Sequence, residues 1–189
     1  VTAYRSVGIA ARQVYTPRWA HCDDNHAWVE VFVDGEWHFL GACEPEEVLD
    51  TGWFSGPANR AILIHTRNFS DYVKESNEEY LGKEGALYYF NHTDFYGRTK
   101  LVKILVKDEN GKPAAGAHIA VEILNMAEFF PAAVMIADAD GEVRMTLGLG
   151  DIRVRAFDGI RRAEAMMRIE EEDSLELVLR EEAVPEADD

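Results

Sequence analysis

Alternating apolar and polar positions divide most of the chain into short strand-like segments. In its first part these segments cover residues 12–16, 27–33, 36–40 and 60–67. Asp34-Gly35 separates two of them, and Asp-Gly between such runs is the strongest short-range signal for a β-hairpin, because both central residues of a type I′ turn take positive φ. The pattern therefore predicts a hairpin over residues 27–40 within a small β-sheet.

A second series of strand-like runs begins after Lys100. The intervening residues 68–99 are rich in Tyr, Asn and Glu without a clean period, so we expect irregular structure with some helix there. The later runs are joined by turns that contain Asp, Asn and Gly, and they cover residues 101–107, 117–124, 132–137, 142–147, 152–157, 163–169 and 175–179. Short runs at this spacing predict an antiparallel β-sandwich of the immunoglobulin-like or prealbumin-like kind.

This change of pattern predicts a domain boundary near residues 99–101. We expect a first domain over residues 1–99, the sandwich over residues 100–180 and an acidic tail over residues 181–189. The chain has 189 residues, of which 47% are hydrophobic, and this is enough to build two small cores.

Acidic residues outnumber basic ones and gather at the end of the chain. The net charge is −16, and residues 170–189 carry ten acidic side chains with only Arg180 against them. A chain of this charge is repelled by phosphate backbones and anionic membrane surfaces, so we expect no nucleic-acid partner. No apolar run approaches the roughly 20 residues needed to cross a bilayer, so we expect no membrane span either.

The first residues point to a segment that continues upstream. Val1 is not a start methionine, and residues 1–7 followed by Gly8 look like the last turns of a helix that ends at a glycine. We therefore expect a missing N-terminal segment of the same protein as one partner of this chain.

The densest group of reactive side chains lies around the predicted hairpin. His21, Cys22, His26 and Cys43 are suitable zinc ligands by type. Structural zinc sites usually take their ligands as two closely spaced pairs, however, and Cys43 stands alone, so we expect no metal and no cofactor. Without a partner group, Cys22 and Cys43 fit small buried or half-buried thiols that have no chemical role.

The register of the hairpin determines which side chains can meet. A two-residue turn at Asp34-Gly35, continued along both strands, places His26 opposite Cys43. His26, Trp28 and Glu30 then share one face of the sheet, while the valines of the same strand point to the other face, which we expect to be the core. Glu30 is expected to be an exposed strand carboxylate.

Three motifs in this region match a known pattern: Gly8-Ile9-Ala10-Ala11-Arg12, His26-Ala27-Trp28-Val29-Glu30 and Asp34-Gly35-Glu36-Trp37. With them the chain resembles the transglutaminase-like superfamily over about residues 1–67. The resemblance implies a fold class of α+β transglutaminase-like (cysteine-protease-like) core, truncated here, followed by the all-β sandwich. In that core a helix carries the nucleophilic cysteine at its N-terminus and packs on an antiparallel sheet.

The resemblance also implies roles for particular residues. His26 becomes the catalytic histidine, and the nucleophilic cysteine falls upstream of Val1. The third member of the triad, usually an aspartate, falls on Gly41, which has no side chain to orient an imidazole. We favour Glu44 as its substitute, and an altered or lost triad is the alternative.

Other side chains near His26 complete the expected site. Asp23, Asp24 and Asp50 are further candidates for the orienting acid. Trp19, Trp28 and Cys43 are expected to line the substrate cleft.

The leading hypothesis is a transglutaminase-like thiol enzyme that acts on amide bonds as a peptidase, amidase or acyltransferase. Its substrate would be a peptide or protein, including one that bears glycans, in a bacterial periplasm, at the cell surface or outside the cell. The fragment without its cysteine would be inactive. The alternative is a non-catalytic protein that binds peptides or glycans and keeps the fold with a degraded triad.

Overall fold

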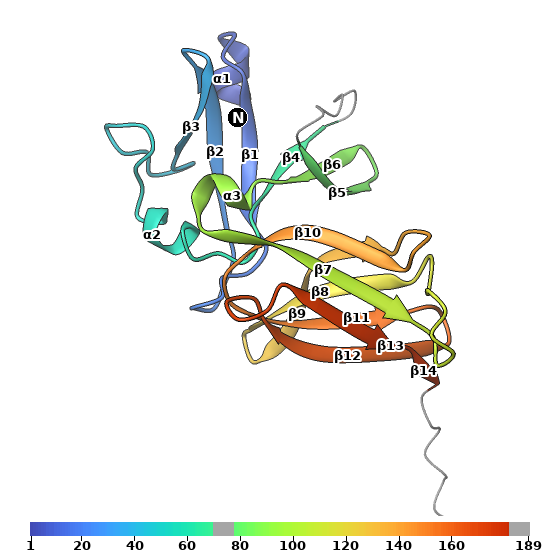
Figure 1. The fold of residues 1–189 in the computed structure, drawn as a ribbon. Helices are drawn as coiled ribbons and strands as arrows, with labels where there is room; N and C mark the ends of the chain where they lie inside the picture. Colours follow the sequence, from blue (N-terminus) through green and yellow to red (C-terminus); the bar gives the residue numbers. More distant parts are fainter. Residues whose placement is uncertain (70–77, 182–189) are drawn as a thin grey trace, which may run out of the picture.

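The computed structural model describes residues 1–69 and 78–181. Within them the chain forms a six-stranded sheet, which comes from the first half of the sequence, and a sandwich of two sheets, which comes from the second (Figure 1). Residues 182–189 of the expected acidic tail lie outside the described residues. The division into domains at residues 1–99 and 100–180 stays a prediction.

The six-stranded sheet is antiparallel throughout, in the order β3-β2-β1-β4-β6-β5. Its strands are β1 (Ala11–Thr16), β2 (His26–Val33), β3 (Glu36–Leu40), β4 (His65–Asn68), β5 (Glu79–Glu84) and β6 (Leu87–Asn91). Three short helices flank it: α1 (Thr2–Ser6), α2 (Ser55–Ala58) and α3 (Thr93–Tyr96).

The predicted hairpin and its register are confirmed. Asp34 and Gly35 have φ values of 54° and 91°, as a type I′ turn requires. Pairing runs from Val33 opposite Glu36 to Val29 opposite Leu40. It stops there because β3 ends at Leu40, so His26 does not face Cys43 across the hairpin as expected; it pairs instead with Thr16 of β1.

Both faces of this sheet are buried over β1 and β2. The valine face packs under α1, with Val1, Tyr4 and Ile9 against a cluster of Ala11, Val29, Val31 and Leu40. The larger core lies on the other face, which carries Trp28, and it is formed by Val14, Trp19, Trp28, Phe54, Ala58, Ala61, Ile64 and Tyr96. The valine face is therefore a core face, as expected, but the smaller of two.

The sandwich packs a three-stranded sheet, in the order β10-β7-β13, on a five-stranded sheet, in the order β14-β12-β11-β8-β9. The strands are β7 (Thr99–Lys107), β8 (His118–Asn125), β9 (Glu128–Ile136), β10 (Glu142–Gly148), β11 (Asp151–Phe157), β12 (Arg161–Arg168), β13 (Ser174–Val178) and β14 (Arg180–Glu181). Aspartates shape its turns: the Asp108 and Asp138 carboxylates each accept hydrogen bonds from two backbone N–H groups of their own turn.

The two parts are joined by backbone contact as well as by side chains. Ile62 and Leu63 leave the first part and enter the core of the sandwich. The Gly148 N–H donates to the Ile62 carbonyl at 2.8 Å. A Cβ atom at residue 148 would lie 1.9 Å from the Ala61 carbonyl oxygen, so this close approach requires glycine.

The expected fold class, an α+β transglutaminase-like core followed by an all-β sandwich, is wrong for the described residues, which are nearly all β. In this part of the chain the longest helix, α1, has five residues, and no helix is long and apolar enough to cross a bilayer. Much of the stretch expected to be irregular forms the β5–β6 hairpin. A bulge between Tyr80 and Gly82 shifts its register, and such a shift hides the two-residue period in the sequence.

Candidate functional site

His26 begins β2 and lies inside a group of aromatic rings. The centroid of its imidazole ring is 4.7 Å from that of Trp53, 5.0 Å from Phe54, 5.8 Å from Trp28 and 6.2 Å from Trp19. Trp19 and Trp28 are almost fully buried, at 2% and 1% exposure, whereas Trp53 is 60% exposed. The two buried tryptophans therefore pack against the imidazole ring, and Trp53 is the exposed member of this aromatic group.

This surrounding favours the neutral form of the imidazole. Burial lowers the pKa of His26 below its ordinary value, and the charge of Asp24 opposes part of that shift. Among residues 1–69 and 78–181, neither ring nitrogen makes a hydrogen bond. The ring is thus held by aromatic packing rather than by hydrogen bonds.

Gly41, at the position expected for the orienting acid, has a structural role. A Cβ atom there would lie 2.6 Å from the carbonyl oxygen of Glu44, because the chain folds back tightly over residue 41. Glu44 is exposed, and its carboxylate makes no hydrogen bond or ion pair with another described residue.

The three aspartates named as further candidates contact other groups. Asp50 accepts hydrogen bonds from the Phe39 N–H at 2.9 Å and pairs with His38 Nδ1 at 2.7 Å. Asp23 accepts from the Met126 N–H at 2.7 Å, and the Asp24 N–H donates to Asn125. Among them, Asp24 is the residue whose charge acts on His26.

Cys22 and Cys43 are exposed free thiols. The expectation of buried or half-buried thiols is therefore wrong. Both lie in loops: Cys22 precedes β2, and Cys43 follows β3. In the described part of the chain, no group of three His, Cys, Asp or Glu side chains is placed to hold a metal ion.

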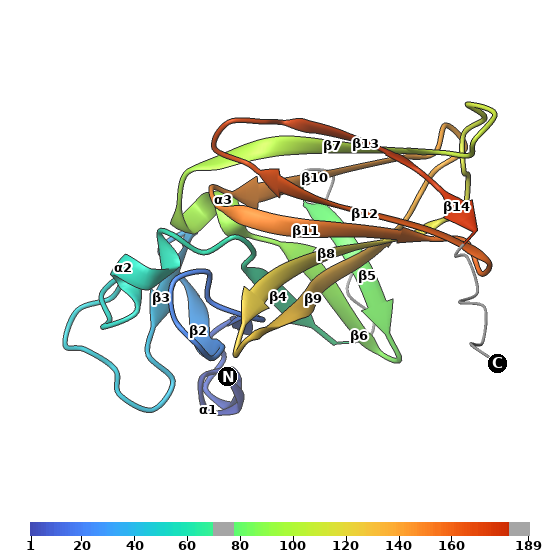
Figure 2. The same cartoon turned by 90° about the horizontal axis from the view of Figure 1, so that it is seen from below.

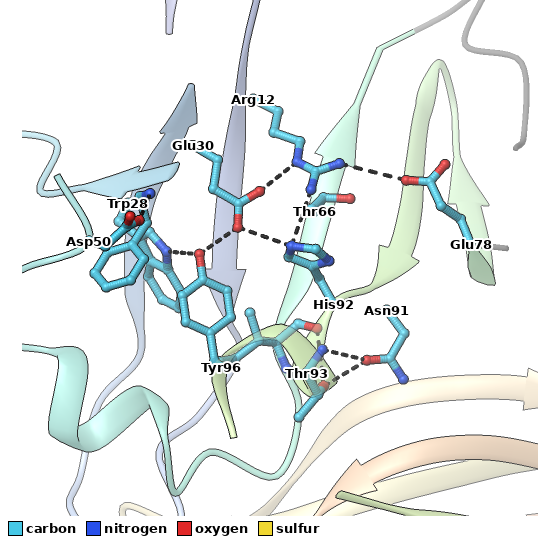
Figure 3. Close-up of polar contacts among 12 residues, drawn as sticks. Arg12, Trp28, Glu30, Asp50, Thr66, Glu78, Asn91, His92, Thr93 and Tyr96 are labelled. Atoms are coloured by element: carbon cyan, nitrogen blue, oxygen red, sulfur yellow. Dashed lines mark hydrogen bonds and ion pairs between the residues drawn. The ribbon is translucent and has the colours of Figure 1, made fainter. Parts of the chain in front are cut away.

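A buried ionic network lies on the same face of the sheet as His26. Figure 3 shows Arg12, Glu30, His92 and Tyr96 pointing toward one another. Glu30 is fully buried; Arg12 Nε donates to its Oε2 at 2.6 Å, and the Tyr96 hydroxyl donates to its Oε1 at 2.5 Å. Glu30 is therefore not the exposed carboxylate that we expected.

The charges of this network support one another. Burial alone would raise the pKa of Glu30, but the contact with His92, the charge of Arg12 and the hydrogen bond from Tyr96 outweigh it, so the pKa lies below its ordinary value. Burial and the neighbouring Glu30 charge raise the pKa of Tyr96. Glu30 is thus a carboxylate with occupied oxygens and is unsuited to act as a general base.

His92 joins the network through one nitrogen atom with two possible partners. Its Nε2 lies 3.1 Å from Arg12 Nη2, which is a donor, and 3.2 Å from Glu30 Oε1, which is an acceptor. A single ring nitrogen cannot accept from the first and donate to the second at once, so the tautomer of His92 selects one of them.

Trp28 connects the network to the aromatic rings around His26. The Trp28 Nε1–H donates to the Tyr96 hydroxyl at 2.8 Å, and the Tyr96 hydroxyl donates in turn to Glu30 (Figure 3). Glu30 therefore orients the indole that stacks on His26. The antiparallel register of β1 and β2 places Arg12 directly opposite Glu30; this register was not predicted from the sequence.

The comparisons with known proteins cover only part of this structure. A model of the transglutaminase-like superfamily matches residues 1–42, a segment that contains α1, the β1–β3 strands and His26 but ends before Glu44. No curated protein matches the chain. Among solved structures the chain is similar to a streptococcal ancillary pilin, with a TM-score of 0.36 and 10% sequence identity over 91% of this chain and 62% of the pilin chain. The chain thus spans less than two thirds of the length of that protein.

Proposed function

We propose that this chain is the histidine-bearing part of a transglutaminase-like thiol enzyme that acts on amide bonds. The observation that carries the proposal is His26. It falls inside the family match of residues 1–42, its nitrogen atoms make no hydrogen bond within the described chain, and burial lowers its pKa and so favours the neutral imidazole. A neutral imidazole of this kind is what a thiol nucleophile needs as its proton partner.

The proposed cysteine lies upstream of Val1. Its sulfur transfers a proton to His26 and attacks the carbonyl carbon of the amide, and the new C–S bond forms an acyl-enzyme as the C–N bond breaks. His26 gives the proton to the departing amine. Water or a second amine then attacks the acyl-enzyme, releases the product and restores the thiol.

The ring of His26 requires orientation, and two groups are proposed to supply it. Stacking on Trp28 and Trp19 holds the plane of the ring. Glu44, on the exposed loop that folds over Gly41, is our candidate for the orienting acid when substrate is bound, and Cys43 is proposed to lie beside that substrate.

Thiol labelling of the full-length protein tests this function. Exposed Cys22 and Cys43 serve as reference thiols within the same molecule. We expect an upstream cysteine to react with iodoacetamide at least about tenfold faster than either reference at pH 7, as thiolates do. His26→Ala should remove this advantage, and His118→Ala, at an exposed position in the sandwich, should preserve it. An upstream cysteine no faster than Cys22, or an unchanged rate in His26→Ala, would refute the proposal.

A second candidate function is a non-catalytic protein that binds peptides or glycans in a bacterial envelope. Two observations favour it: Gly41 stands where the orienting acid belongs, and Trp53 exposes a large aromatic surface beside His26. Titration of the chain with a tri-alanine peptide or a chito-oligosaccharide, followed by tryptophan fluorescence, tests it. Saturable quenching that Trp53→Ala abolishes would support binding, and no change at millimolar ligand would argue against it.

A further inference from the structure

The loop that leads into His26 is held by the sandwich. The tip of the β8–β9 hairpin lies beside the segment that precedes β2 (Figure 2). Asn125, the last residue of β8, is only 4% exposed although it stands at the tip of a hairpin. Its burial comes from contact with residues 19–24, which we name the 19–24 loop.

Both polar atoms of the Asn125 side-chain amide take part in this contact. Its Nδ2 donates to the carbonyl oxygens of Trp19 and Cys22, both at 2.9 Å, and its Oδ1 accepts from the Asp24 N–H at 3.1 Å. Within the loop, the Trp19 N–H donates to the Asp24 carbonyl at 3.0 Å. One side chain thus binds three backbone groups of a segment that belongs to no strand.

The backbone on both sides of this contact takes an unusual conformation. Asp24 has a φ of 104°, and Met126 and Ala127 have φ values of 52° and 61°. Residues other than glycine adopt such values at a cost, and they persist where the surroundings stabilise them. Asn125 stabilises Asp24 through its N–H, and Asp23 accepts from the Met126 N–H at 2.7 Å.

The 19–24 loop in turn supplies two of the groups that surround His26. Trp19 stacks on the imidazole ring, and Asp24 is the group whose charge acts on His26. The centroid of the His21 ring also lies 5.7 Å from that of Trp19. A displacement of the loop would therefore move both Trp19, which stacks on His26, and Asp24, whose charge acts on it.

We infer that Asn125 is a positioning residue for His26, by which the sandwich sets the conformation of the proposed active site. The catalytic meaning of this inference rests on the proposed function. The positioning itself is a property of the described contacts and is measurable without any activity.

NMR of the imidazole C–H groups in the 189-residue chain tests the positioning. Asn125→Asp keeps the size of the side chain but places an acceptor against the carbonyl oxygens of Trp19 and Cys22. We expect the His26 resonances to shift, because ring currents from Trp19 change, while those of His38 and His118 stay in place. Asn110→Asp, the same change in an exposed turn of the sandwich, should leave all of them unchanged.

Unchanged His26 resonances in Asn125→Asp would overturn the inference. If this variant unfolds, as loss of the His38 and His118 resonances would show, Asp23→Ala removes the second tether without altering β8. It should shift the His26 resonances in the folded chain, and their constancy would equally overturn the inference.

Labelling of the full-length protein separates this inference from the proposed function. The His26 resonances could shift in Asn125→Asp while the thiol reactivity does not respond to His26→Ala. This result would refute the proposed enzymatic function and leave the positioning role of Asn125 intact. A thiol that responds to His26→Ala but keeps its pH profile in Asn125→Asp would refute the catalytic role of Asn125 alone. We expect both substitutions to change that profile.

Discussion

His65 makes the stability of this protein sensitive to mild acid. The side chain is 5% exposed, lies between the rings of Tyr15 and Tyr89, and its Nδ1 has no hydrogen-bond partner in the described chain. Burial, together with the nearby charge of Arg67, lowers the pKa of His65 to about 4. In the unfolded chain the same imidazole titrates near its ordinary value of about 6.5.

The direction of the effect follows from proton binding. Between these two pKa values the unfolded chain binds more protons than the folded one, so the free energy of unfolding falls as the pH falls. Relative to neutral pH, His65 should lower that free energy by about 2 kcal/mol at pH 5 and about 3 kcal/mol at pH 4. The loss begins near pH 6.5 and is complete below pH 4.

Urea unfolding followed by tryptophan fluorescence between pH 4 and pH 7.5 measures this effect. His65→Gln cannot titrate, so its stability relative to the wild type should rise by about 2 kcal/mol between pH 7 and pH 5. His118→Gln is the control. Because His118 is exposed, the curve of stability against pH for this variant should run parallel to that of the wild type. Parallel pH curves for His65→Gln and the wild type would refute the reasoning.

Two further predictions concern the first sheet. Gly41→Ala should lower the free energy of unfolding measured in urea by about 1–3 kcal/mol, because the new Cβ atom would clash with the Glu44 carbonyl. Gly56→Ala is the control and should not destabilise the chain, because the space around Gly56 is open. Equal effects of the two substitutions would contradict this prediction. Arg12→Met should lower the free energy of unfolding by about 3–5 kcal/mol, because it leaves the Glu30 charge buried without its partner. The double variant Arg12→Met with Glu30→Met should be less destabilised than Arg12→Met alone. A double variant that is at least as unstable would contradict this prediction.

Local features of this fold could be predicted from neighbouring residues. Asp34-Gly35 and the alternating runs beside it define a hairpin whose turn and register need no distant contact. The short runs after residue 100 likewise predict the strands of the sandwich. The error in fold class came from the resemblance, which brings a helix with it, while α1 has only five residues.

The parts that could not be predicted depend on contacts between distant residues. Alternation places Glu30 on one face of β2, but its burial depends on Tyr96, which lies 66 residues later in the chain. The loop around His26 depends on Asn125, about a hundred residues away. Gly41 was interpreted as a lost acid because the return of the backbone over it is not visible in sequence.

The pH dependence of thiol labelling in the full-length protein tests the central claim most directly. A cysteine paired with His26 should stay reactive toward iodoacetamide well below pH 7. Once the thiol proton has moved to His26, the positive charge of the imidazolium stabilises the thiolate and lowers the pKa of the thiol from about 8.5. In His26→Ala the rate should instead rise only as an ordinary thiol ionises. Identical profiles for the wild type and His26→Ala would contradict the account.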